Sequence, residues 1–407
     1  MTRTLISFLG RVPKGEGGYR TTRYTFADGS RTEPVAFFGW PLQRRLAARR
    51  MVVLGTAGSM WDHLTEGDLE LGSAREADRL RLIERTSQKS VEQDDLAALE
   101  PVLSERLGCE LRLRIIPYAR TREEQMQVLA AMAAHVEAGD EVHLDVSHGF
   151  RHLPMLALLA ALFLRRVRRA RIEGIWYGSF DPDTGQADVF ELSALLGLAD
   201  GLDALAQFEK DGDYGVFEPL LRAGGVDAQA IEPLRRAAYY ENILNVGEAT
   251  GQLRRARAAL RPMTLSPELA LLWPTIERRL AWLDEDRQFQ KQTRLARQCF
   301  ERRDYLRATL YAFEAVITRL CQREGVPITD FEAREQARQR YEAAFQGVRT
   351  EESLNYHLLK NLRNQVAHGT RGSTGEVQQA LLNEANMCAT LDRLIKAIET
   401  GRLPAER

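Results

Sequence analysis

The sequence has few cysteines and no long hydrophobic segment. Its four cysteines lie far apart and include no C-x-x-C pair: Cys109, Cys299, Cys321 and Cys388. This spacing argues against a zinc knuckle and against a disulfide framework, so we expect reduced, buried thiols. The longest apolar run, Leu153 to Leu164, is far shorter than the roughly 20 residues that cross a bilayer. It predicts a buried helix.

An excess of charge of either sign is also lacking. Lys and Arg number 56 against 57 Asp and Glu, a formal net charge of −1. The chain therefore has no overall basic field, and any contact with nucleic acid must be local. The N-terminal MTRTLISFLG lacks the longer apolar region and the cleavage site of a signal peptide, so we expect a cytoplasmic protein. The 407 residues predict two large domains, or one domain with a helical extension.

Strand and helix patterns alternate in the first half of the chain. Extended segments are also expected over residues 24–38, around the turn residues Asp28-Gly29. The predicted strands are Thr4–Leu9, Met51–Gly55, Glu110–Tyr118, Glu141–Val146 and Arg171–Tyr177, and the predicted helices are Ala74–Leu107, Arg122–Glu137 and Leu153–Arg168. Strands separated by helices pair in parallel and are covered on both faces, which predicts a doubly wound, Rossmann-like α/β domain.

The second half of the chain has a helical pattern. From about Ser193 the strand patterns stop, and apolar residues recur at three- and four-residue spacing. This periodicity predicts helices over Leu195–Phe208, Ala237–Leu260, Leu306–Leu320 and Leu381–Ile398. The proline-interrupted stretch 261–274 and the highly charged stretch 283–297 are typical of a connector that leads into another helical bundle. The C-terminal half is therefore expected to be all-α.

Three loops follow predicted strands, at the sheet edge where open α/β folds bind ligands. The first, Gly10 to Gly18, combines backbone freedom with two cations, but it lacks the GK[ST] ending of a P-loop and the spacing of a dinucleotide fingerprint. The second, Gly55 to Trp61, offers hydroxyls, bare backbone and a large aromatic side chain. An equally good interpretation of this second loop is a helix-capping turn with Trp61 in the core.

The third loop, Asp145 to Pro154, carries the most information. Pro154 sits where a first helical turn tolerates proline, and backbone N–H groups at that helix start, with Arg151 and a hydroxyl, suit a phosphate or a ribose edge. Ser147 and His148 could suggest a nucleophile pair, but adjacent side chains on an extended chain point apart and no GxSxG elbow is present. A purely structural loop is the remaining alternative.

These segments resemble a known family. LISFLG, GTAGSMWD and especially DVSHGFRHLP resemble the CARF domains of CRISPR-associated proteins, in the branch with the signature D-[VI]-[ST]-H-G-F-R-x-x-P. The resemblance covers residues 1–195 and implies binding of a cyclic oligoadenylate across the two-fold axis of a homodimer. The ligand-binding residues it implies are Gly10, Arg11, Ser59, Trp61, Ser147, His148, Gly149, Phe150 and Arg151. The role of the glycine-rich insertion, Lys14 to Gly18, stays open.

A second motif, RNQVAHG, lies at the end of a predicted helix that starts near Glu351. Gly369 is placed to end the helix as a C-cap, and His368 lies in the last turn. Five residues rotate Arg363 and His368 by about 140° from each other, so a joint site is expected to need a second copy of the helix. The other interpretation is a surface helix on which both side chains are merely exposed.

This motif, which lies on a late helix of the predicted all-α half, resembles the R-x4-6-H motif of HEPN ribonucleases. In that family two domains pair into one composite, metal-independent site, which implies catalytic roles for Arg363 and His368 and a supporting role for Asn364. The helix Tyr305–Leu320 resembles the HEPN helix with an acidic residue, here Glu314, which could equally be an ion-pair partner of a neighbouring helix. The implied domains are a sensor at 1–195, a helical connector at 196–290 and a HEPN-like domain at 291–407.

Together the two resemblances predict a homodimeric ribonuclease of type III CRISPR defence that cyclic oligoadenylate activates. We expect single-stranded RNA as the substrate, 2′,3′-cyclic phosphate products, cyclic tetra-adenylate as the activator, and no metal, cofactor, membrane or stable DNA partner. A positioned base and a cation suffice for attack of the RNA 2′-hydroxyl on its own phosphate. Two alternatives remain open: a ligand-gated, non-catalytic binder of RNA or of a partner, and a ring nuclease that degrades the cyclic oligoadenylate.

Overall fold

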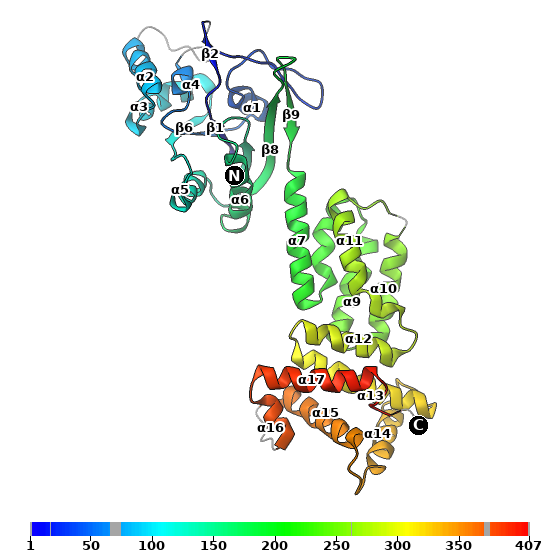
Figure 1. Cartoon of the computed structure of the whole chain (residues 1–407). Coiled ribbons are helices and arrows are strands. Elements are labelled where there is room, and N and C mark those ends of the chain that lie inside the picture. Colours follow the sequence, from blue (N-terminus) through cyan, green and yellow to red (C-terminus); the bar gives the residue numbers. More distant parts are fainter. Residues whose placement is uncertain (1, 17, 66–74, 262, 370–374, 406–407) are drawn as a thin grey trace. The chain divides into compact units, whose positions relative to one another are not determined.

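The protein folds into two compact units, Met1–Leu196 and Gly197–Arg407 (Figure 1). The computed structural model describes residues 2–16, 18–65, 75–261, 263–369 and 375–405. In these ranges no helix is long and apolar enough to cross a membrane.

The first unit is built around a mostly parallel sheet of seven strands. The strands of the unit are β1 (Arg3–Leu9), β2 (Lys14–Gly15), β3 (Gly18–Tyr19), β4 (Tyr24–Thr25), β5 (Arg50–Gly55), β6 (Glu110–Ile115), β7 (Glu141–Asp145), β8 (Arg171–Phe180) and β9 (Ala187–Glu191). The sheet order is β4-β9-β8-β7-β1-β5-β6, and only the β8–β9 pair is antiparallel. Strands β2 and β3 form a separate hairpin.

Helices cover both faces of this sheet, which confirms the predicted doubly wound α/β fold. They are α1 (Gly39–Leu46), the short η1 (Trp61–Leu64), α2 (Glu76–Gln88), α3 (Gln93–Ala97), α4 (Glu100–Leu107), α5 (Arg122–Ala133) and α6 (Leu153–Arg166). Alternate residues of β1 enter different cores: Leu5 and Leu9 pack with Trp40 on one face, and Ile6 and Phe8 pack on the other face. A strand buried on both faces is expected to be mostly apolar, as β1 is apart from the buried Thr4 and Ser7.

Some boundaries differ from the sequence prediction. The single helix expected over Ala74–Leu107 is three helices, α2 to α4; Ala74 itself lies outside the described residues. The chain leaves α2 through Lys89 in the left-handed conformation (φ 55°). The extended segments expected over residues 24–38 contain only the two-residue β4, and the antiparallel β9 was not predicted. Its sequence, ADVFE, is short and only half apolar, which gives a weak strand pattern.

Every regular element described in the second unit is a helix, which confirms the predicted all-α C-terminal half. The helices are α7 (Ala194–Asp211), η3 (Tyr214–Phe217), α8 (Glu218–Ala223), α9 (Ala228–Asn242), α10 (Val246–Leu260), α11 (Pro267–Arg279), η4 (Ala281–Asp284), α12 (Gln288–Glu301), α13 (Tyr305–Glu324), α14 (Phe331–Ala343), α15 (Glu351–His368), α16 (Gly375–Leu381) and α17 (Glu384–Glu399). Asp304, Asp330 and Thr350 cap α13, α14 and α15, each accepting a hydrogen bond from a backbone N–H three residues ahead.

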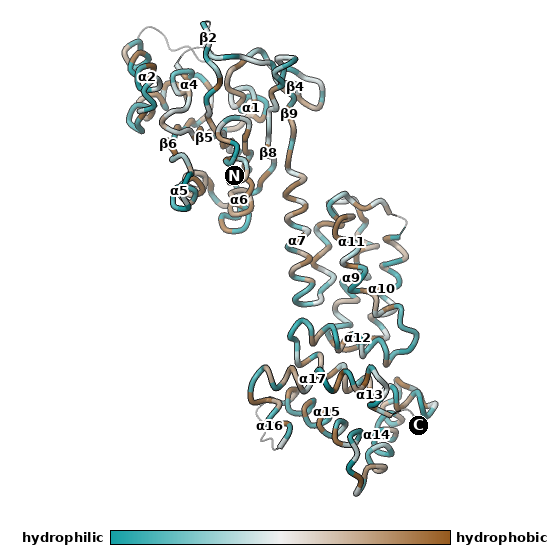
Figure 2. Tube along the Cα trace, viewed as in Figure 1, coloured by the Kyte–Doolittle hydropathy of each residue, from teal (hydrophilic) through white to brown (hydrophobic). Residues whose placement is uncertain are grey.

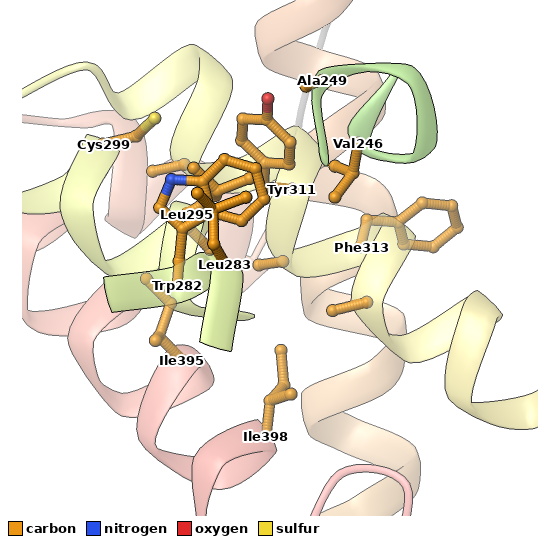
Figure 3. Packing of buried hydrophobic residues seen from close by; sticks show 14 of the residues in the cluster. Val246, Ala249, Trp282, Leu283, Leu295, Cys299, Tyr311, Phe313, Ile395 and Ile398 are labelled. Atoms are coloured by element: carbon orange, nitrogen blue, oxygen red, sulfur yellow. The ribbon is translucent and has the colours of Figure 1, made fainter. Parts of the chain in front are cut away.

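One continuous core runs through the helical unit, from Ala204 to Leu403. Hydrophobic and hydrophilic residues are interleaved along its helices (Figure 2), as expected for helices with one buried face. Figure 3 shows Trp282, Leu295 and Tyr311 packed together, and Phe313 on another side of α13. The boundary expected at 290/291 inside this unit stays a prediction.

The four cysteines are all free. Cys109, Cys299 and Cys321 are buried as expected, whereas Cys388 is only half-buried. Burial raises the pKa of the Cys109 thiol to about 11 and that of Cys299 to about 12. These thiols therefore stay protonated and behave as small apolar side chains.

Candidate functional site

The first candidate site lies where the strand order of the sheet reverses. Strand β1 sits between β7 and β5. The chain continues from β1 to β5 and β6 on one side of β1, and from β7 to β8 on the other side. Loops that leave the carboxyl ends of strands at such a point are the usual ligand position in open α/β sheets. The loops after β1, β5 and β7 are the three singled out in the sequence, so the structure brings them to one edge.

Gly10 joins these three loops. A Cβ built on Gly10 would lie 2.5 Å from the backbone nitrogen of Gly149, so only glycine allows the β1 and β7 loops to approach this closely. Gly149 itself has a φ of 114°, a conformation that is unfavourable for other residues. The Gly10 carbonyl accepts a 2.9 Å hydrogen bond from the Met60 N–H in the β5 loop.

A cavity of about 190 Å³ opens between the loops. Gly10, Arg11, Thr56, Ser59, Gly149 and Phe150 are among the residues that line it. Ser59 is held in place because its Oγ accepts a 3.0 Å hydrogen bond from the Thr56 N–H. The cavity therefore offers backbone groups, hydroxyls and one guanidinium, a set that suits ribose and phosphate oxygens.

Trp61 does not contribute to this cavity. Its side chain is fully buried, and its Nε1 donates a 2.8 Å hydrogen bond to the Thr56 carbonyl. The expectation that Trp61 contacts a ligand is therefore wrong in this structure, and the alternative of a core tryptophan under the β5 loop holds.

Ser147 and His148 support the signature loop with their side chains. Ser147 Oγ accepts a 2.7 Å hydrogen bond from the Gly178 N–H, and His148 Nε2 accepts one of 3.2 Å from the Phe38 N–H. Burial lowers the pKa of His148 to about 4, with smaller contributions from His63 and Arg20. The imidazole is thus a neutral anchor, and the two residues are not arranged as a nucleophile pair.

Asp145 and Ser7 were not assigned a role from the sequence. Ser7 Oγ donates a hydrogen bond to Asp145 Oδ2, and the Ser147 N–H donates one of 2.9 Å to Asp145 Oδ1. Burial raises the pKa of the fully buried Asp145 carboxyl. The signal for this pair was a serine inside the otherwise apolar run of β1.

The remaining predicted ligand residues are exposed. Arg11 and Arg151 are exposed, and Phe150 keeps 44% of its surface exposed. The Phe150 ring lies 5.7 Å from the rings of Tyr118 and His152, and it stacks on the latter. These aromatic neighbours, one from the loop after β6, were not predicted.

The glycine-rich insertion is tied down by a buried carboxylate. Lys14 Nζ forms a 2.9 Å ion pair with Asp62, which also accepts a 2.7 Å hydrogen bond from Tyr19 OH. Asp62 is 2% exposed. The described part of the insertion therefore includes a structural cation; Gly17 lies outside the described residues.

The second candidate site is at the end of α15. The helix ends at His368, and Gly369 follows with a φ of 73° and an N–H that donates to the Gln365 carbonyl, 3.0 Å away. The C-cap expected at Gly369 is therefore confirmed. His368 is exposed on this last turn.

Arg363 lies about 1.4 turns earlier and is half-buried. One of its terminal nitrogens donates a 3.0 Å hydrogen bond to Asn364 Oδ1, and its guanidinium lies 5.6 Å above the Phe313 ring. Its Nε is buried without a hydrogen-bond partner among the described residues. The structure thus brings Arg363 and Asn364 together, with a guanidinium that has donors to spare.

Arg363 and Asn364 line a groove of about 350 Å³ between α13, α14 and α15, and His368 is not among the lining residues. Glu314, also in the groove, forms a 2.5 Å ion pair with Arg334 of α14. This is the alternative that the sequence left open for Glu314. No cluster of three or more potential metal ligands occurs among the described residues.

Comparison with known proteins agrees with the α/β unit. Residues 4–182 match the family model described as "CRISPR system endoribonuclease Csx1, CARF domain". The α/β unit is a CARF domain. The chain is thereby a CARF-containing CRISPR accessory protein, as the signature loop predicted.

Two further similarities extend beyond the CARF domain. The CRISPR-associated protein MJ1674 of Methanocaldococcus jannaschii is 23% identical over 413 residues, which cover 92% of this chain. The chain spans 63% of the length of that relative. Csm6 of Enterococcus italicus, solved with cyclic hexa-2′-fluoro-hexa-dAMP, matches over 98% of this chain and 93% of its own, with a TM-score of 0.37 and 12% identity.

Proposed function

We propose that this protein is a cyclic oligoadenylate-activated endoribonuclease of type III CRISPR defence. Its CARF domain senses the cyclic oligoadenylate, and its helical unit cuts single-stranded RNA without a metal ion. The observation that carries the proposal is the presence of two sites in one chain: a CARF cavity walled by Gly10 and Gly149, and a helix end that carries Arg363 and His368.

The CARF cavity has the chemistry of a nucleotide site. The close approach of Gly10 and Gly149 leaves backbone groups facing the cavity, while Arg11 and Ser59 add donors from the neighbouring loops. A cavity of about 190 Å³ is smaller than the roughly 300–1,000 Å³ of a complete small-molecule site. It therefore fits a part of a cyclic oligoadenylate, with a second copy of the chain holding the rest.

A homodimer is supported by an apolar stripe on α6. The stripe consists of Met155, Leu159, Phe163 and Val167, which are 72, 57, 41 and 62% exposed. Residues four apart lie on one side of a helix, so these side chains form a continuous surface that starts directly after the signature loop. A two-fold axis would place the same stripe of the partner against it and bring the two cavities together.

The chemistry requires only a base and a cation. His368 would handle the proton of the attacking 2′-hydroxyl, and Arg363 would stabilise the charge that develops on the phosphate. Asn364 holds the Arg363 guanidinium at 3.0 Å. The products are a 2′,3′-cyclic phosphate and a 5′-hydroxyl. Activation requires that the ligand bind the cleaving arrangement of the dimer more tightly than the resting one.

The test incubates the pure protein with end-labelled single-stranded RNA, EDTA and cyclic oligoadenylates of four or six residues. Cleavage that needs the ligand, and that is lost in His368→Ala and Arg363→Ala, supports the proposal. Matched controls are His357→Ala, an exposed histidine of the same helix, and Arg349→Ala, an exposed arginine before it; both should cleave normally. Intact RNA despite tight ligand binding would instead indicate a non-catalytic regulator.

The same reaction distinguishes a ring nuclease. If the cyclic oligoadenylate is itself degraded, loss of that turnover in Arg11→Ala, with His368 unchanged, would place the activity in the CARF cavity. Ring turnover without RNA cleavage would overturn the proposed ribonuclease.

A further inference from the structure

The groove beside Arg363 carries an excess of positive charge. Arg334, Arg338, Lys360 and Arg363 line it together with two carboxylates, Glu314 and Glu335. The lining therefore has a net charge of +2, which becomes +1 when Glu342, paired with Lys360 and Arg338 beside the groove, is included. The chain as a whole has a net charge of −1, so an anionic ligand would be attracted to this local excess of positive charge and not to the protein in general.

Neighbouring groups fix these cations in position. Arg334 donates to Glu314 and, over 3.0 Å, to the Ile328 carbonyl. Lys360 Nζ donates to Glu342 over 2.8 Å, and Arg338 pairs with the same carboxylate. Arginine has five donors and lysine three, so cations held in this way keep donors for phosphate oxygens, and little side-chain entropy remains to be lost on binding.

The groove also has an exposed aromatic side chain at its edge. Phe331, the first residue of α14, lines the groove and is 81% exposed. In the same groove the Arg363 guanidinium lies over the Phe313 ring, which Figure 3 shows pointing away from Trp282. An exposed ring beside a cationic groove is the combination that binds single-stranded nucleic acid, because bases stack on the ring while cations follow the backbone.

We propose that this groove binds a nucleotide of the RNA substrate that flanks the scissile phosphate. Its base stacks on Phe331, and its backbone phosphate contacts Lys360 and Arg334. The groove volume of about 350 Å³ reaches the lower limit of small-molecule sites, roughly 300 Å³, so it accommodates one nucleotide. This inference rests on the proposed ribonuclease function and assigns to it a subsite that adjoins Arg363 and extends to residues of α13 and α14 that the Arg363 and His368 motif does not include.

The test measures binding in a cleavage-deficient background, so that it does not depend on whether the protein cuts RNA. Affinity of the His368→Ala protein for fluorescent single-stranded RNA is measured by anisotropy, with cyclic oligoadenylate present. Adding Phe331→Ala should weaken binding about tenfold, in the range found for loss of one stacked base, and Phe331→Trp should restore it. The matched control is Tyr239→Ala, an aromatic residue of α9 that is 60% exposed and lies outside the groove.

Salt dependence separates the two contacts. Adding Lys360→Gln should reduce the slope of log K against log salt by about 0.7, the value for one lost phosphate contact on a single strand. Phe331→Ala should leave the slope unchanged. Equal affinity in the Phe331→Ala and parent proteins would overturn the subsite, even if the chain proves to be a ribonuclease.

The alternative to a nucleotide subsite is that the exposed Phe331 contacts a second copy of this chain. Sedimentation velocity tests this alternative. A dimer that stays intact in Phe331→Ala, with weakened RNA binding, supports the nucleotide subsite. A dimer that dissociates in Phe331→Ala would overturn it, because the ring would then belong to a contact between copies.

Discussion

Gly10 and Gly149 are packed backbone to backbone at the carboxyl edge of the sheet in the CARF domain. The distance of 2.5 Å between a Cβ built on Gly10 and the Gly149 nitrogen is far shorter than any van der Waals contact. The two loops that would hold the ligand are therefore fixed relative to each other by the absence of one methyl group.

Replacing Gly10 tests this relationship directly. Gly10→Ala should force the β1 and β7 loops apart, lower the stability by about 1–3 kcal/mol as overpacking usually does, and weaken cyclic oligoadenylate binding at least tenfold. Calorimetry gives both quantities, as melting temperature and as affinity. The control is Gly15→Ala, because a Cβ there meets nothing within 4 Å; equal affinities in the two variants would contradict the prediction.

His148 predicts a dependence of stability on pH. Its pKa in the folded protein is about 4, whereas an unperturbed histidine titrates near 6.5. Between these values the unfolded chain binds a proton that the folded chain does not. The free energy of unfolding should therefore fall as the pH is lowered from about 6.5 to 4, by at most about 3 kcal/mol from this group.

The His148→Gln variant isolates this contribution, since its amide oxygen can still accept the hydrogen bond from Phe38. Melting temperatures measured from pH 7 to pH 4.5 should decline less steeply in the variant. The buried Asp145, whose pKa is raised, titrates in both proteins and cancels in the comparison. Parallel curves would contradict this prediction, because they would mean that the pKa of His148 does not differ between the folded and the unfolded chain.

The sequence predicted those strands whose own run of apolar residues is a strong pattern. Strands such as β1 and β5 are apolar because both faces are buried, and this property is local enough to see in a sequence. The edge strand β4 was predicted too long and its neighbour β9 was missed, because tertiary pairing at Tyr24 and Ala187, and not their own composition, makes them strands.

The site was predictable as a set of loops but not as a set of contacts. Spacing after strands located Gly10, Ser59 and the signature loop, yet it could not distinguish side chains that face the cavity from those that hold it. Trp61 and His148 are residue types that often contact ligands, but both side chains are engaged by backbone groups. The partner of His148 lies 110 residues away, and no local pattern in the sequence encodes such a contact.

The stripe on α6 predicts how the proposed dimer can be broken. Leu159→Arg places a charge at the middle of this stripe, where Leu159 is 57% exposed, and should raise the dimer dissociation constant at least tenfold while the monomer stays folded. Ligand-activated RNA cleavage should fall with it, because the proposed composite site needs two chains. Leu271→Arg is the control, since Leu271 is 71% exposed on α11. Sedimentation velocity gives the mass of each variant; an intact Leu159→Arg dimer would place the interface elsewhere.

The Arg363→Lys variant tests whether a positive charge alone is sufficient for RNA cleavage at the second site. Lysine keeps the positive charge but loses the planar group that donates to Asn364 and lies over Phe313, so it would reach the phosphate without a fixed orientation. The rate constant of ligand-activated cleavage should fall about 10²- to 10³-fold, the effect of removing one preorganised donor, with RNA affinity changed far less. Binding of cyclic oligoadenylate should be unaffected, because that cavity lies in the CARF domain. Single-turnover cleavage and anisotropy on the same preparation separate the two effects. If Arg363→Lys cleaves at the parent rate, the guanidinium does not orient the phosphate, and a simple electrostatic role for the side chain would replace it.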